Sequence, residues 1–200
     1  MNILRITKTI IYLILLIVLN SCYTSADYAL LKKSETKSNA VYGKILVLKN
    51  NNPTQDVVFN KMITDDFTNL FGQNLTQKLK NDYFDNFKFL PIINKELLEK
   101  IKIDNPDLDY MMFIRFMTTD SDISKPKTLQ IIDYKDIKYI REYHILFDLY
   151  NLNTKENIYS NEAVSILEKL DASGITPSEL SQLKQTYKKI FKDFAKSISQ

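Results

Sequence analysis

The chain has 200 residues and a formal net charge of +3, with 27 Lys and Arg residues against 24 Asp and Glu residues. This small surplus excludes proteins that bind nucleic acid through a strongly basic surface. The chain also holds one cysteine and one histidine, which excludes an internal disulfide and a metal site built from several of these ligands. We therefore expect no nucleic-acid partner and no cofactor.

The first 21 residues have the layout of an export signal. Arg5 and Lys8 form a short basic region with no acid before Asp27, and residues 10–19 are an unbroken apolar or aromatic run. Ten helical residues span about 15 Å, roughly half the hydrocarbon thickness of a bilayer, so this run is too short for a stable transmembrane helix. An ordinary cleaved secretory signal and a short N-terminal anchor are the alternatives.

Cys22 favours a lipoprotein over both alternatives. Leu19, Asn20 and Ser21 precede it, and this run resembles the lipobox of bacterial lipoprotein precursors. Asn20 departs from that pattern, in which a small or aliphatic residue is commoner. The resemblance implies cleavage before Cys22 and anchoring by the lipid alone, because several acyl chains on one cysteine are enough for stable binding. An acylated cysteine also avoids the liability of a free thiol in an oxidising compartment.

Cleavage at this site divides the chain into three parts. Residues 1–21 are the signal peptide, residues 22–42 the lipidated cysteine with a polar, flexible tether, and residues 43–200 a single globular domain. The mature chain keeps 25 basic and 24 acidic side chains, a net charge of +1. Residues 23–26 lack the acidic run that sends some lipoproteins to the cell surface, so we expect an outer-membrane protein that faces the periplasm.

The domain opens with a strand and a long helix. Residues 43–49 include four consecutive aliphatic side chains, which indicates a strand buried on both faces. Apolar residues at helical spacing predict an amphipathic helix over residues 59–79. Gly72 falls inside this helix, and close packing against the sheet is the simplest reason for a glycine there.

Two further strands and a short helix follow. Residues 87–92 predict a strand, Asn94 is placed to cap a helix over residues 95–101, and residues 110–117 form an apolar run typical of a central strand. After them we expect a polar loop over residues 118–126.

The last part of the chain predicts a hairpin and a helix. A small strand or flap over residues 128–133 precedes the alternating residues 143–150, which pair with residues 158–166. Residues 176–179 read Thr-Pro-Ser-Glu, a capping box with proline at the first helical position. The order β-α-β-α-β-(β)-β-β-α predicts an α/β layer sandwich, a mixed sheet of about five strands packed with two or three helices.

Two segments carry a resemblance to a known group of domains. Residues 108–113 read Leu-Asp-Tyr-Met-Met-Phe, and residues 147–159 contain the hairpin. Together with the element order over residues 43–198, they resemble the periplasmic domain shared by the curli-secretion lipoprotein, the N-terminal part of the Tol-system β-propeller protein and the lipoprotein activators of penicillin-binding proteins. Residues 153–157 replace the usual Thr-Gly turn. The resemblance implies periplasmic scaffolding, assembly or partner activation.

No spacing of residues indicates catalysis. His144 is the sole histidine and is expected to be a surface or packing residue. The acids at 65–66 fall on a helix face, and residues 104–109 lack the Gly and terminal Glu of a calcium loop. Ser160 and Ser165 have no recognisable base. We therefore predict a protein that is not an enzyme.

The function predicted instead is a non-catalytic binding or assembly module for another envelope protein or cell-wall component. Residues 118–141 interrupt the regular pattern and are the expected contact surface. Arg115 either pairs with an acid or lines this surface, and the tyrosines nearby suit either an interface or the core. The alternative is a small-ligand carrier or a hydrolase with an unrecognised site. The candidate partner-binding residues are Arg115, Tyr134, Tyr139, Arg141 and Tyr143.

Replacing Cys22 with alanine should abolish membrane association, because the short apolar run cannot hold the chain in a bilayer by itself. Metabolic labelling with a clickable palmitate, followed by membrane fractionation, measures this. A wild-type protein without label, or a Cys22→Ala variant that stays in the membrane with its signal uncut, would contradict the lipid anchor.

Overall fold

The computed structural model describes residues 26–32, 41–50, 53–76, 79, 93–122, 138–170 and 177–198. The signal peptide, Cys22 and the strands expected at residues 87–92 and 128–133 lie outside these ranges. Within the part of the chain that is described, no helix combines the length and apolar character needed to span a bilayer.

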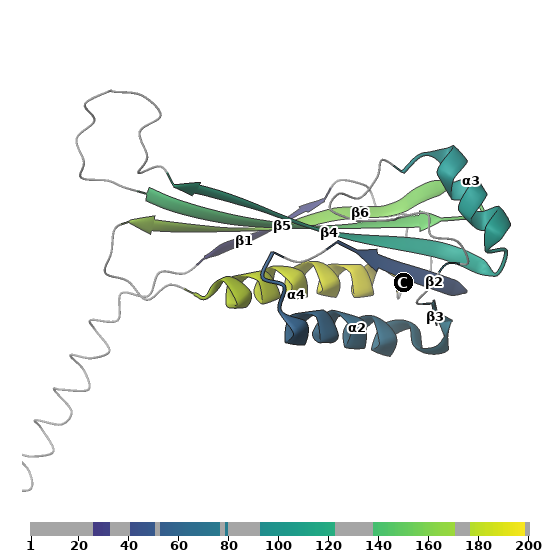
Figure 1. Ribbon diagram of the computed structural model, residues 1–200, viewed down its shortest axis with the longest axis horizontal. Coiled ribbons are helices and arrows are strands. Elements are labelled where there is room, and N and C mark those ends of the chain that lie inside the picture. Colours follow the sequence, from purple (N-terminus) through teal and green to yellow (C-terminus); the bar gives the residue numbers. More distant parts are fainter. Residues whose placement is uncertain are drawn as a thin grey trace, which may run out of the picture.

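A six-stranded mixed sheet carries helices on both of its faces (Figure 1). Its strands lie in the order β1-β6-β5-β4-β2-β3. Strand β2 is parallel to both of its neighbours, and the other neighbouring strands are antiparallel. This arrangement confirms the predicted α/β layer fold and the central position of β4. The elements are β1 (Asp27–Lys32), β2 (Lys44–Lys49), α2 (Val57–Phe71), the 3-10 helix η1 (Gly72–Asn74), β3 (Leu75–Thr76), α3 (Lys95–Asp104), β4 (Leu108–Asp122), β5 (Lys138–Asn151), β6 (Glu156–Leu170) and α4 (Glu179–Ile198).

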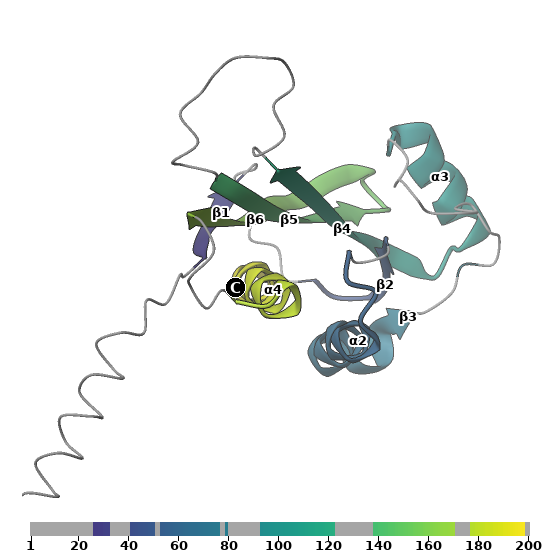
Figure 2. The same ribbon diagram turned by 60° about the vertical axis from the view of Figure 1, so that its left-hand side comes forward.

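The main core lies between the sheet and the pair α2 and α4, which cover the same face (Figures 1 and 2). Phe67 of α2 is at its centre, with ring centroids 6.0 Å from Phe147 of β5, 5.4 Å from Phe191 and 5.9 Å from Phe194 of α4. The helix α3 packs on the opposite face at one end, over a smaller apolar cluster that includes Leu98. The apolar sides of the predicted helices and strands thus pack into two separate cores.

The helix α2 ends at Gly72, which the apolar spacing placed inside a longer helix. Gly72 has a φ of 54°, and its N–H donates to the Thr68 carbonyl. A side chain at this position would meet nothing within 4 Å, so the expectation of close packing is wrong. Glycine is favoured here because L side chains rarely adopt a positive φ. The chain then turns through η1 into the two-residue strand β3.

The start of α4 also differs from the predicted capping box. The Ser178 Oγ accepts a hydrogen bond from the Ser181 N–H at 3.1 Å, so Ser178 is the N-cap. Pro177 therefore precedes the cap and is not the first helical residue. The expected cap, Thr176, lies outside the described residues.

Strand β1 lies within the segment predicted to be a flexible tether, so that prediction is wrong for residues 27–32. The strand pairs antiparallel with β6, from Asp27 opposite Ile166 to Lys32 opposite Asn161. Leu30 packs against the main core and Ala26 is buried. A six-residue edge strand with only one buried side gives too weak a period to stand out among polar neighbours. The domain therefore begins near residue 26.

A fragment of residues 26–198 should unfold cooperatively in urea. A fragment of residues 43–198 should be less stable by about 2 kcal/mol or more, because it loses the apolar contacts of β1 and exposes the edge of β6. Urea midpoints and slopes of the two fragments measure the difference. Equal midpoints would mean that β1 contributes nothing to the domain.

Candidate functional site: a cleft at the β2 edge

Two of the predicted partner-binding residues are buried inside the domain. Arg141 is 7% exposed; its Nε donates to the Gln182 Oε1 at 2.9 Å and its Nη2 to the Pro177 carbonyl at 2.9 Å. Tyr143 is 2% exposed, with its ring centroid 5.9 Å from the Arg141 guanidinium. Arg141 therefore fastens the start of α4 to β5, and Tyr143 belongs to the core. A partner cannot reach either side chain in the folded domain, which corrects the prediction for both.

Arg115 lies on the sheet face opposite α2 and α4, where it pairs with an acid. Its Nη2 is 3.2 Å from the Asp148 Oδ2, and the Ser160 Oγ donates to the Asp148 Oδ1 at 2.6 Å. Pairing was the first of the two roles expected for Arg115, and the structure confirms it. The Ser160 hydroxyl donates to a carboxylate that also pairs with an arginine, so the three side chains link β4, β5 and β6 on this face.

The histidine lies on the same face, between two carboxylates. The Nδ1 of His144 is 2.6 Å from the Glu162 Oε1, and its Nε2 is 3.5 Å from the Glu142 Oε2. Within the described ranges no three His, Cys, Asp or Glu side chains are grouped so that they could hold a metal ion. His144 thus contacts two acids on this face, and its expected role as a surface or packing residue stays a prediction.

The predicted contact region, residues 118–141, is partly regular structure. Strand β4 continues to Asp122 and pairs with β5 as far as Tyr139, so residues 118–122 are not part of the loop expected there. The side chain of Tyr139 is not described, and residues 123–137, which include Tyr134, lie outside the described residues. The expectation that this loop binds a partner therefore stays a prediction.

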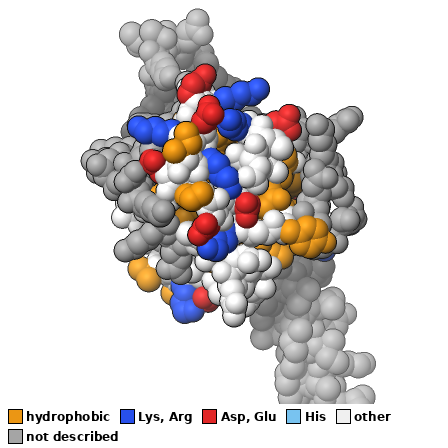
Figure 3. Space-filling model, turned by 90° about the vertical axis from the view of Figure 1, so that its right-hand side faces the viewer, with side chains coloured by type: hydrophobic (Ala, Val, Ile, Leu, Met, Phe, Trp, Pro, Cys, Tyr) orange, Lys and Arg blue, Asp and Glu red, His pale blue; other side chains and the backbone are white. Residues whose placement is uncertain are grey.

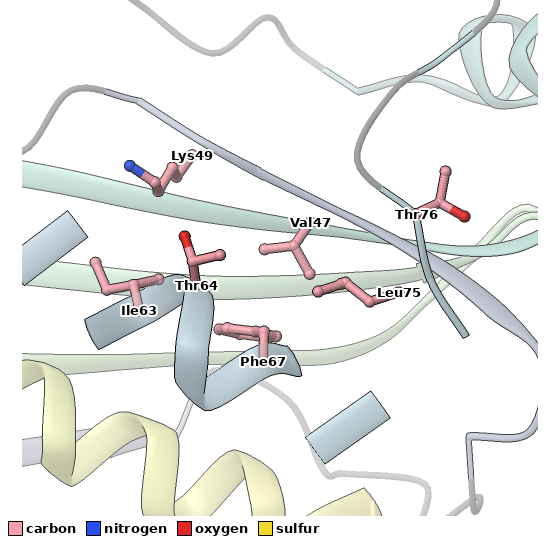
Figure 4. A pocket seen from close by; sticks show the side chains of 7 residues that line it. All are labelled: Val47, Lys49, Ile63, Thr64, Phe67, Leu75 and Thr76. Carbon is pink, nitrogen blue, oxygen red and sulfur yellow. The ribbon is translucent and has the colours of Figure 1, made fainter. Parts of the chain in front are cut away.

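A cleft of about 230 Å³ opens where β3 ends beside β2 (Figure 4). Its floor is apolar, since Ile63 and Phe67 of α2 are each 1% exposed. In Figure 4 the Thr64 hydroxyl points toward the side of the cleft that holds Lys49. The cleft is lined by Val47 and Lys49 of β2, Ile63, Thr64 and Phe67 of α2, and Leu75 and Thr76 of β3.

The cleft lies beside the described residues of β3 and is lined from β2 and α2. Alternation along β2 points Ile45, Val47 and Lys49 toward the side of α2. Strand β3 pairs with β2 only at Ile45 and Leu46, so from Val47 onward no described strand covers this edge. The α2 helix forms the opposite wall because Phe67 anchors it to the core.

Lys49 is the charged group of this cleft. Its side chain is half-buried, and its Nζ donates to the neutral Asn60 Oδ1 at 2.6 Å. Burial lowers the pKa of the Lys49 ammonium. None of the described acids forms an ion pair with it. A partly desolvated cation without a carboxylate is costly, so the site favours an anionic ligand.

Lysines at the α3 end of the molecule are paired, in contrast. Figure 3 shows basic and acidic side chains intermixed there. Lys44 lies 3.4 Å from Asp107, and Lys155 lies 3.0 Å from Glu99. Charges of both signs thus offset one another at that end, so the unpaired charge of Lys49 is a local feature.

Asp109, from the segment that carries the family resemblance, joins β2 to α3 and the hairpin. Burial acts to raise its pKa, but hydrogen bonds from Asn153 and the Lys44 N–H and the charge of Lys102 outweigh it and hold the pKa below the usual value. Gly43, with a φ of 129°, leaves room for this carboxylate, since a side chain there would collide with it. Asp109 is therefore a structural residue.

Comparisons with known proteins assign no family to the chain. No protein-family model and no curated protein matches it. Similar solved structures include a neuraminyllactose-binding hemagglutinin homolog from Helicobacter pylori, with 11% identity and a TM-score of 0.42 over 82% of this chain and 90% of that one. The lipoprotein GNA1162 from Neisseria meningitidis has 16% identity and a TM-score of 0.39 over 78% and 99%. The protein CT253 from Chlamydia trachomatis has 11% identity and a TM-score of 0.40 over 76% and 93%. The resemblance to the curli, Tol and penicillin-binding-protein group stays a prediction.

Sequence reasoning missed the cleft because Lys49 stands at the end of an apolar run, where a lysine usually marks the strand boundary. The sequence held one indication of it. Side chains alternate along a strand, so Lys49, two residues after Val47, lies on the same side of β2 as Val47. The start of β3 was not readable, because it depends on where Gly72 ends the helix.

Replacing Lys49 with methionine should leave the free energy of unfolding at pH 7 unchanged or raise it by less than about 1 kcal/mol. The folded pKa is depressed, so the unfolded chain binds more protons, and the stability of the wild type relative to the variant should rise as the pH approaches about 10.4. Urea unfolding at several pH values measures this. Lys61→Met, at an exposed lysine of α2, is the control. A loss well above 1 kcal/mol at pH 7 would make Lys49 a stabilising residue.

Proposed function

We propose that the protein is a non-catalytic binding module of the bacterial envelope, anchored to the outer membrane through the lipid on Cys22 and facing the periplasm. We further propose that the cleft at the β2 edge contacts another envelope protein. The observation that carries this proposal is the half-buried Lys49, which has no carboxylate partner among the described residues.

The size and position of the cleft favour a protein partner over a small ligand. Pockets for drug-sized ligands usually measure about 300–1,000 Å³, whereas this cleft measures about 230 Å³. It also lies at the edge of the sheet, where a surface side chain of another protein can enter without displacing the core. A small-ligand carrier or hydrolase remains the second candidate.

The hydroxyl groups and the imidazole that could support catalysis are engaged in structural contacts. Ser165 is fully buried and accepts hydrogen bonds from Thr186 at 2.7 Å and Gln182 at 3.2 Å. Ser160 and His144 are bonded to acids on the far face of the sheet. These contacts support a binding role without chemistry.

The anchor and the cleft belong to opposite edges of the sheet. Strand β1, which follows the lipidated end, forms one edge, and β3 forms the other. Five strand spacings of about 4.8 Å separate them by roughly 24 Å. From Cys22 to Ala26 the chain extends at most about 14 Å, so the anchor holds the domain near the bilayer. Tethering raises the local concentration of envelope partners, which makes a weak affinity useful.

A photo-crosslinking amino acid in place of Thr64 should capture a specific envelope protein in intact cells, because this exposed α2 residue lines the cleft. Asn69 is the control, since it is exposed on the same helix but turned away by about 140°. Capture should disappear in the Cys22→Ala background. Equal products from both positions, or none from Thr64, would contradict the proposed function.

A further inference from the structure

The outer side of α4 carries charge of one sign. The helix has five lysines and two acids, and each acid is bonded to a residue of the sheet. Glu179 lies 3.5 Å from Arg141 of β5. The Asp193 Oδ2 accepts hydrogen bonds from the Tyr159 hydroxyl at 2.9 Å and the Asn161 amide at 2.8 Å, both from β6. The charge on the side that faces away from the sheet is therefore basic.

Four of the five lysines form a continuous row along the helix. Each step of four residues turns by about 40°, so the row extends for about 18 Å within about a third of the helix circumference. The first of the four is partly exposed and the other three are exposed. None of them belongs to an ion pair among the described residues. This lysine row consists of Lys184, Lys188, Lys192 and Lys196.

The helix dipole does not account for the lysine row. It favours cations in the last turn of a helix, where only Lys196 lies, whereas Lys184 belongs to the first third of α4. The other helices mix the two signs: α3 carries three lysines and three acids, and on α2 Lys61 lies 2.7 Å from Asp65. Since the mature chain has a net charge of only +1, the row is a local excess of positive charge.

The lysine row lies close to the lipidated end of the chain. The Nζ of Lys189, which directly follows a member of the row, donates to the Tyr28 carbonyl of β1 at 2.5 Å. Tyr28 comes six residues after Cys22, so the chain can separate the two by at most about 22 Å. Figure 2 shows α4 between β1 and α2. A bilayer that holds the lipid is therefore within reach of the row, while the cleft lies at the opposite edge of the sheet.

We infer that the lysine row binds the anionic phosphate headgroups of the bilayer that holds the lipid on Cys22. This inference rests on the anchor in the proposed function and adds a second membrane contact, which orients the domain. All residues of α4 are described, and none of its large apolar side chains is exposed. A protein interface needs an apolar centre, whereas headgroups need only charge. Each lysine near an anionic surface strengthens binding about fivefold.

The first test measures how closely α4 approaches the bilayer in the lipidated full-length protein. A fluorophore on Gln185→Cys, an exposed position beside the lysine row, is quenched by lipids that carry a nitroxide headgroup. Ile103→Cys of α3, which packs on the opposite face of the sheet, is the control position. In vesicles with about 30% phosphatidylglycerol, quenching at position 185 should exceed that at position 103 at least threefold. Phosphatidylcholine vesicles, or about 0.5 M salt, should remove the difference. Equal quenching at both positions in the anionic vesicles would overturn the inference.

The second test neutralises the lysine row with a matched control. Changing all four lysines of the row to glutamine should lower quenching at position 185 to its value in phosphatidylcholine vesicles, and α4 should still form because glutamine and lysine have similar helix propensities. The control set changes the net charge equally at exposed or partly exposed lysines elsewhere and should keep the quenching. It consists of Lys44→Gln, Lys61→Gln, Lys95→Gln and Lys155→Gln.

The outcomes separate this inference from the proposed function. Protein that does not enter vesicles would contradict the anchor and the inference together. Vesicle-bound protein whose quenching ignores the lysine row, or falls equally with the control set, would overturn the inference alone. Capture of a partner from Thr64 should persist in the variant without the row, because the cleft and the row are separate surfaces.

Discussion

The aromatic contact between α2 and α4 determines the arrangement of the rest of the domain. Phe67 touches rings from both α4 and β5, so one side chain ties two helices to the same sheet face. Burying aromatic groups of this size contributes about 2–3 kcal/mol each, with more from edge-to-face geometry. Because Phe67 is fixed, the neighbouring turn of α2 stands beside β2 and supplies a wall of the cleft. The packing of Phe67 in the core therefore fixes the position of this wall.

Three charged side chains of the described residues, Arg141, Arg115 and Asp109, differ from Lys49 in their polar partners. Arg141, Arg115 and Asp109 each have partners of complementary charge or hydrogen-bonding capacity from other elements. Removing one member of such a set would leave a buried group unsatisfied, which makes these residues structural. Lys49 has a neutral amide instead. Among these four charged residues, Lys49 is thus the one that joins no described group of opposite charge.

Helices and strands whose hydrophobic pattern continues over many residues could be predicted from the sequence. Features set by a single backbone angle or by a distant contact could not. The alternation around Phe147 and the cap at Asn94 are local, and both agree with the structure. The end of α2 depends on the positive φ of Gly72, which a hydrophobic pattern does not reveal. Arg141 meets Gln182, 41 positions away, so its burial depends on how α4 docks. The cleft combines both difficulties, because β3 follows Gly72 and pairs with a distant strand.

Protection of a strand edge is another physical reason for a lysine at the end of a strand, because a charge discourages uncontrolled strand pairing. That role needs an ammonium in water, where the charge repels an apolar strand at little cost. Lys49 instead points toward α2, is half-buried and donates to Asn60, so its charge lies over the cleft and not beyond the edge. A lysine that only protects the edge would lose free energy by being partly buried and gain nothing from it. A lysine that binds an anionic group interacts with it more strongly, because the local dielectric constant is lower. The position of the ammonium therefore favours recognition of an anionic group at the cleft over simple protection of the edge.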